Sequence, residues 1–125
     1  HHWALEVRGA DLSAFMSFYT QLLGFSEKPD HEGVVLCGAS ALVFLEDETA
    51  ALKRSPDPLE KPGLRYMTVQ VFDVDEVYAR IIEHGGTGVR APVTLGKTAR
   101  IAFVADPFGN WIELSQRASL VGTLA

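Results

Sequence analysis

The nine residues D-P-F-G-N-W-I-E-L, from Asp106 to Leu114, read as a turn followed by a strand. The pairs Asp106-Pro107 and Gly109-Asn110 are typical of turns, and the side chains after them alternate in character. Alternation with a period of two places Trp111 and Glu113 on one face of the strand. The aliphatic residues that follow each of them lie on the other face.

Glu113 carries a charge in the middle of this otherwise apolar strand. A buried carboxylate without a partner is unfavourable, so the side chain needs a cationic partner, a metal, a ligand or water. Two interpretations are open from the local sequence. Glu113 is either a solvated charge on an edge strand or a functional carboxylate.

The strand at the end of this stretch is the last element of a pattern that fills the second half of the chain. A strand is predicted at 64–72, followed by a helix that Asp73 or Asp75 caps and that Gly85-Gly86 ends. Three further strands are predicted at 87–93, 98–105 and 110–115. The predicted apolar stripe of the helix consists of Val74, Val77, Tyr78, Ile81 and Ile82.

The first half of the chain has the same order of elements. A strand is predicted at 3–7, and a helix then begins at the N-cap Asp11 and ends at Gly24. Three short strands follow at 25–29, 34–37 and 41–45. Each half therefore reads as strand, helix and three strands.

A four-stranded sheet with one helix is too small a core to be stable alone, so we expect the two halves to share one. The predicted fold class is α+β: two βαβββ modules form a curled, mostly antiparallel, eight-stranded trough with the helices outside. Residues 1–125 then form a single domain, with module one at 1–47, a proline-containing linker at 48–63 and module two at 64–117. The side chains predicted to line the trough are His2, Glu6, Tyr66, Thr68, Gln70, Trp111 and Glu113.

The amino-acid composition of the chain disfavours nucleic acids and membranes as binding partners. The chain has 125 residues, of which 47% are hydrophobic and 22% charged, as in a folded globular protein. A net charge of −5 with eleven scattered basic residues disfavours a nucleic-acid partner. The sequence has neither an apolar run long enough to span a bilayer nor a secretory signal, so we expect a cytoplasmic protein without a membrane partner. Cys37, the only cysteine, is predicted to be a buried structural thiol.

Four stretches of the chain resemble the vicinal oxygen chelate superfamily, which includes glyoxalase I, extradiol dioxygenases and bleomycin-resistance proteins. They are H-W-A-L-E-V at 2–7, F-Y-T-Q-L-L-G-F at 18–25, G-L-R-Y-M-T-V-Q-V-F-D-V-D at 63–75 and A-D-P-F-G-N-W-I-E-L at 105–114. The resemblance implies paired βαβββ modules and usually a homodimer. In many members it also implies a divalent metal, such as Zn, Ni, Fe or Mn, at the base of the trough.

The resemblance implies metal ligands at His2 and Glu113, although His2 is either native or part of a purification tag. Tyr66 stands where metal-dependent members have a second histidine, and Phe44 stands where glyoxalase-like members have a fourth ligand. A catalytic site needs about three protein ligands, so two are too few. Glu46, two residues after Phe44, completes a set of three if the register permits.

Two functions follow. In the first, the trough holds a small oxygenated substrate for metal-assisted lyase, isomerase or dioxygenase chemistry, with Glu113 as ligand or general base and Tyr66 as hydrogen-bond donor or acid. In the second, the trough is a metal-free pocket that sequesters an aromatic or amphipathic compound. Trp111, Tyr66 and Phe44 then provide stacking surface, Glu6 and Glu113 favour a cation, and Thr68 and Gln70 complete the lining. A subunit without a ligand of its own is a third possibility.

Overall fold

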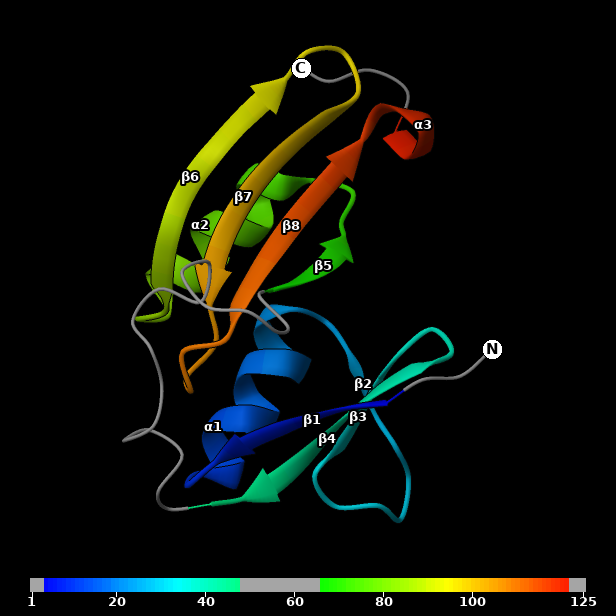
Figure 1. The fold of residues 1–125 in the computed structure, drawn as a ribbon, viewed down its shortest axis with the longest axis vertical. Coiled ribbons are helices and arrows are strands. Elements are labelled where there is room, and N and C mark those ends of the chain that lie inside the picture. The colour runs from blue at the N-terminus through cyan, green and yellow to red at the C-terminus, as the bar shows by residue number, and fades with distance from the viewer. Residues whose placement is uncertain (1–3, 48–65, 122–125) are drawn as a thin grey trace. The chain divides into compact units, whose positions relative to one another are not determined.

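The structure is a computed structural model that describes residues 4–47 and 66–121. The chain divides into two compact units, His1–Arg54 and Ser55–Ala125, and each unit contains its own four-stranded sheet (Figure 1). The predicted linker at 48–63, together with His2 and Trp3, lies outside the described residues. Within the described ranges, none of the helices is long and apolar enough to cross a membrane.

The first unit has the strand order β1-β4-β3-β2. Strands β1 and β4 are parallel, and the other two neighbouring pairs are antiparallel. Its elements are β1 Ala4–Gly9, α1 Leu12–Met16, the π-helix η1 Ser17–Leu22, β2 Ser26–Glu27, β3 Val34–Cys37 and β4 Ser40–Glu46. The predicted N-cap is confirmed, because the Asp11 carboxylate accepts a hydrogen bond of 3.0 Å from the backbone N–H of Ala14.

One predicted helix is divided in the structure. The sequence pattern predicts a continuous α-helix up to Gly24, but its second half is the π-helix η1. Phe15 and Tyr19 are fully buried on this segment and their ring centroids lie 5.0 Å apart. The ring centroid of Tyr19 also lies 5.7 Å from that of Phe25, so the aromatic side chains in the core of the first unit lie along this helical segment.

The second unit repeats this topology with the strand order β5-β8-β7-β6. Strands β5 and β8 are parallel, and the other two neighbouring pairs are antiparallel. Helix α2 covers one face of the sheet (Figure 1). The elements are β5 Tyr66–Gln70, α2 Val74–Glu83, β6 Thr87–Leu95, β7 Ala99–Ala105, β8 Trp111–Arg117 and α3 Ala118–Val121.

Helix α2 begins where one of the two predicted caps places it. The Asp73 carboxylate accepts a hydrogen bond of 3.1 Å from the backbone N–H of Glu76. Val74 and Ile81 are fully buried against the sheet, whose own buried side chains on that face include Ile112 and Leu114. The α+β class and the two βαβββ modules predicted from the sequence are therefore confirmed.

Three details differ from the predictions. Cys37 is exposed, because it is the last residue of β3 at the end of a tight hairpin where it pairs with Ser40. Ile82 is 42% exposed, because the buried stripe of α2 runs through its neighbour Ile81. The short helix α3 after β8 is absent from the prediction.

Candidate ligand-binding face

The pairing of strands in the second unit decides which side chains lie beside Glu113. Glu113 is opposite Thr68 of β5 on one side and opposite Phe103 of β7 on the other. Directly paired residues of neighbouring strands point to the same face of a sheet. We call the face opposite α2 the open face, and its residues on these three strands are Tyr66, Thr68, Gln70, Ile101, Phe103, Ala105, Trp111, Glu113 and Ser115.

The alternation along β8 explains why Glu113 is on this face. Ile112 and Leu114 are fully buried on the face that α2 covers. Their neighbours Trp111 and Glu113 are only half-buried. The strand and the facing of its side chains, as predicted from the sequence, are confirmed.

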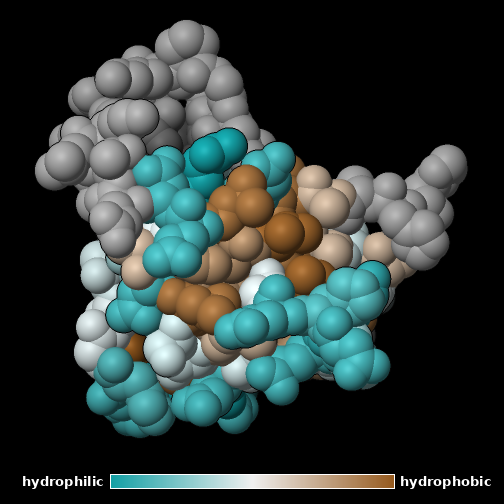
Figure 2. Space-filling view, turned by 90° about the horizontal axis from the view of Figure 1, so that it is seen from below, coloured by the Kyte–Doolittle hydropathy of each residue, from teal (hydrophilic) through white to brown (hydrophobic). Residues whose placement is uncertain are grey.

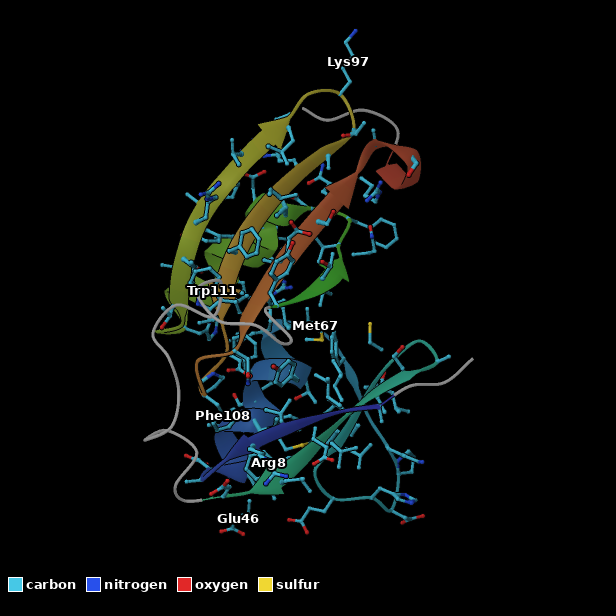
Figure 3. The ribbon with its side chains drawn as sticks, viewed as in Figure 1. Arg8, Glu46, Met67, Lys97, Phe108 and Trp111 are labelled. Carbon is cyan, nitrogen blue, oxygen red and sulfur yellow. The ribbon has the colours of Figure 1, made fainter. Side chains whose placement is uncertain are left out.

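Three aromatic rings lie together on the open face. The rings of Tyr66 and Phe103 meet edge to face, with centroids 5.1 Å apart and planes at 85°. The ring of Trp111 is 6.1 Å from that of Phe103 at an angle of 59°. Figure 3 places Trp111 at the beginning of β8. We call these three residues the aromatic cluster, and they form a surface on which a flat ligand can stack.

Phe103 is the functional candidate that the sequence analysis does not identify. The signal for it is present, because Ala99, Ile101, Phe103 and Ala105 share one face of β7 and Phe103 is the only large aromatic among them. What the sequence lacks is the register between β7 and β8. Only that register places Phe103 directly beside Glu113.

A hydrogen bond orients Glu113 on the open face. The Thr68 hydroxyl donates to Glu113 Oε1 at 3.0 Å. Glu113 remains half-exposed, and Thr68 and Gln70 beside it are exposed. The Thr68 side chain holds one oxygen, and no hydrogen bond between described residues engages the other, so that oxygen can accept from a cationic or hydrogen-bonding group of a ligand.

The turn before β8 has a structural role. Asp106 is 4% exposed, and its carboxylate accepts hydrogen bonds from the backbone N–H groups of Phe108 at 2.9 Å and Asn110 at 2.8 Å. It also accepts one from the side-chain amide of Asn110 at 2.7 Å. These bonds fix the direction in which the chain enters β8, and so they position Trp111 and Glu113 without belonging to the site.

The described residues do not fit a metal centre. In the part of the chain that the structure describes, no three His, Cys, Asp or Glu side chains come close enough to hold an ion. The nearest neighbours of Glu113 in the ladder are a threonine and a phenylalanine. Tyr66 contributes its ring to the aromatic cluster. His2, the other predicted ligand, is outside the described residues.

In the first unit the structure separates two of the predicted site residues. Phe44 lies opposite Val7, and its ring centroid is 5.2 Å from that of Phe15 of α1, so the half-buried ring faces the helix. Glu6 lies opposite Val43 on the other face of the sheet. Phe44 and Glu6, which are both predicted to bind the ligand, therefore lie on opposite faces of the first sheet.

The pairing of β1 with β4 also decides which face carries Glu46, the predicted third metal ligand. The residues of β4 that alternate with Phe44, and therefore share the face of Glu6, are the apolar Val43 and Leu45. Glu46 is paired with Gly9 at the end of the strand and shares the face of Phe44, opposite to that of Glu6. Arg8 Nη2 lies 3.6 Å from Glu6 Oε2, and Arg8 Nη1 lies 3.8 Å from Asp47 Oδ2. Arg8 thus forms ion pairs with Glu6 and Asp47 at this end of the sheet.

Comparison with known proteins decides the family. The sequence model of the Glyoxalase/Bleomycin resistance protein/Dioxygenase superfamily matches residues 1–114. The chain belongs to this superfamily. Members of the superfamily bind small molecules and often form dimers. No curated protein sequence is significantly similar to the chain.

Solved structures of this superfamily share the fold of the chain. UcmS2 is 23% identical with a TM-score of 0.68, over 93% of this chain and 97% of that one. A glyoxalase/bleomycin resistance protein/dioxygenase family enzyme from Burkholderia phytofirmans PsJN is 22% identical with a TM-score of 0.69, over 90% and 94%. TnmS3, an antibiotic binding protein from Streptomyces sp. CB03234, is 24% identical with a TM-score of 0.62, over 94% and 95%. At these identities the likeness establishes the fold alone.

Proposed function

We propose that this superfamily member binds a small aromatic molecule carrying a positive charge, and that it does so on the open face of the second sheet. The observation that carries the proposal is the aromatic cluster beside the half-exposed Glu113. An aromatic ligand stacks on such a surface, and the carboxylate pairs with its cation. Drug sequestration of the bleomycin-resistance kind is the corresponding function.

The exposure of the cluster supports binding over a purely structural role. Tyr66 is 38% exposed although its ring packs on that of Phe103, so part of the residue remains accessible to a ligand. Rings that only fill a core are buried, like Phe15 and Tyr19 in the first unit. A solved relative of the same fold, TnmS3, is described as an antibiotic binding protein, which agrees with this class of function.

Titration of the intrinsic tryptophan fluorescence tests the proposal. The ligands are benzylamine, which is the smallest cationic aromatic, and bleomycin, which is a large one. The protein has two tryptophans, so Trp3→Phe isolates the signal of Trp111. We expect both ligands to quench that signal and Glu113→Gln to weaken their binding about tenfold, as for the loss of one charge-assisted hydrogen bond. Quenching that is unchanged in Glu113→Gln, or absent for both ligands, would contradict the proposal.

Metal-assisted chemistry is the second candidate function. The position of Glu113 on the last strand, which matches the superfamily's metal-ligand pattern, favours it. Its test is metal analysis of tag-free protein after supplementation with Zn, Ni, Fe and Mn, alongside His2→Ala and Glu113→Gln. Stoichiometric metal that both substitutions remove would support this candidate, and metal-free protein would reject it.

A homodimer is the expected assembly. Hydrophobic residues gather at the centre of the face seen from below in Figure 2, with hydrophilic residues around them. Apolar regions bordered by polar residues are typical of surfaces that bind another protein. Light scattering coupled to gel filtration would detect the dimer directly, and a monomer mass at all accessible concentrations would reject it.

A further inference from the structure

Strand β6 carries a cationic side chain to the row of residues that contains Glu113. Arg90 of β6 is paired with Phe103 of β7, which is paired with Glu113 of β8. Glu113 is in turn paired with Thr68 of β5. One row across the sheet therefore reads arginine, phenylalanine, glutamate, threonine, with the two opposite charges on either side of an aromatic ring.

An irregularity of β6 is what brings Arg90 to this row. From Leu95 to Val93 the pairing with β7 is regular, and continuing it would place Arg90 opposite Val104 on the face that α2 covers. The ladder instead shifts between Val93 and Arg90, where three steps on β6 match two on β7. This β-bulge moves Arg90 opposite Phe103, and bulges commonly re-aim a side chain next to functional sites.

A second irregularity restores the inward facing of the strand directly afterwards. The pairing shifts again between Arg90 and Gly88, and Gly88 is then opposite Val104. A side chain at position 88 would collide with the Tyr78 ring of α2, so glycine is required there. The first bulge therefore places Arg90 on the open face, where Val93 and Leu95 of the same strand also lie, and the second returns Gly88 to the face that α2 covers.

Arg90 is exposed, and none of the ion pairs between described residues involves it, so within 4–47 and 66–121 its guanidinium has no carboxylate partner. Glu113 lies two strands away, which is roughly 10 Å at the usual spacing of strands. Phe103 between them keeps this space apolar, so the two charges do not neutralise each other across the sheet.

We propose that the open face selects an amphoteric aromatic ligand, whose ring rests on the aromatic cluster while its cationic end pairs with Glu113 and its anionic end with Arg90. This inference rests on the proposed function and specifies the class of ligand. Guanidinium groups bind carboxylates and phosphates through two parallel hydrogen bonds, so the anionic group is one of these. A ligand with only a cation leaves Arg90 without an ionic partner, and a ligand with only an anion leaves Glu113 without one.

The test uses three small probes with the same ring: 4-(aminomethyl)benzoate with both charges, benzylamine with the cation alone, and 4-methylbenzoate with the anion alone. Binding is followed by NMR titration of ¹⁵N-labelled protein, with the Trp111 indole N–H as reporter. The amphoteric probe is expected to bind about tenfold more tightly than either of the others, as one added charge-assisted hydrogen bond predicts.

Substitutions separate the two ends of the ligand. Arg90→Gln is expected to weaken the amphoteric probe and 4-methylbenzoate about tenfold and to leave benzylamine unchanged. Lys97→Gln is the matched control, because it removes the same charge from the β6–β7 turn, where Figure 3 shows the side chain extending from the loop. That control is expected to bind all three probes like the unsubstituted protein.

The outcomes distinguish this inference from the function on which it rests. If Arg90→Gln and Lys97→Gln behave alike, Arg90 has no role and the inference is overturned, while benzylamine binding that depends on Glu113 keeps the proposed function. If no probe perturbs Trp111, both are rejected. If Arg90→Gln instead changes the molecular mass in gel filtration, the open face is a contact between two copies of the chain and the inference is overturned.

Discussion

The Thr68 hydroxyl donates a hydrogen bond of 3.0 Å to Glu113 Oε1 across the β5–β8 ladder. The bond restricts the rotamer of a half-exposed glutamate, whose side chain otherwise loses rotational freedom on binding. A carboxylate already oriented by the sheet binds a cation at a lower entropic cost. Thr68 is therefore a positioning residue for the proposed site.

Replacement of this hydroxyl tests its role. Thr68→Val is expected to weaken benzylamine binding by a factor of about three to ten, the range of one modest hydrogen bond. Thr68→Ser keeps the hydroxyl and is expected to retain most of the affinity. The measurement is the Trp111 fluorescence titration. Equal affinities of the valine and serine variants would show that the hydrogen bond does not matter for binding.

The turn that precedes β8 should be a major determinant of stability. Asp106→Ala leaves the part-buried N–H groups of Phe108 and Asn110 without the Asp106 carboxylate as acceptor and should lower the free energy of unfolding by about 1–3 kcal/mol. Asp106→Asn keeps one accepting oxygen and should lower it less. Urea denaturation followed by circular dichroism measures both. An alanine variant as stable as the original protein would refute the structural role assigned to Asp106.

The two faces of the second sheet should respond differently to the same substitution. Leu114 is fully buried, and Leu114→Ala should lower the free energy of unfolding by about 2–5 kcal/mol. Leu95 is 47% exposed, and Leu95→Ala should change it by less than about 0.5 kcal/mol. Chemical denaturation of both variants provides the comparison. Similar losses of unfolding free energy in the two variants would contradict the burial of Leu114.

The pair of Asp75 and Arg100 predicts a dependence of stability on pH. Arg100 Nε and Nη2 each donate to the Asp75 carboxylate at 2.8 Å. These hydrogen bonds hold the pKa of the Asp75 carboxyl below its usual value of 3.8. A carboxyl with a lower pKa in the folded state stabilises the fold above its unfolded pKa, and the stabilisation is lost as the pH falls through the folded value.

Double-mutant analysis isolates that contribution. Asp75→Asn and Arg100→Gln, alone and combined, are denatured with urea between pH 7 and pH 3. We expect a favourable coupling above pH 3.8 that declines as the pH falls below it. Because 54% of the Asp75 side chain is exposed, the coupling should be small and should weaken in salt. A coupling free energy that grows toward low pH would contradict the lowered pKa of the Asp75 carboxyl.

The sequence by itself determined the order of the eight strands and of the helical segment that follows the first strand of each unit, and the alternation of side chains along β8. Asp11 and Asp73 cap the helices as their positions predict. The alternation along β8 puts Trp111 and Glu113 on one face and the two aliphatic residues on the other. These features depend on interactions among neighbours in the chain, which a period of two or 3.6 residues expresses directly.

Only the tertiary structure decided which face of a strand meets the helix and which residues of different strands become neighbours. Phe44 packs inward on Phe15 although its pattern alone permits either face. Phe103 joins Glu113, and two bulges bring Arg90 to the same row. The physical reason is that ladder register is set by hydrogen bonds between distant segments, and a shift of one residue turns a side chain to the opposite face.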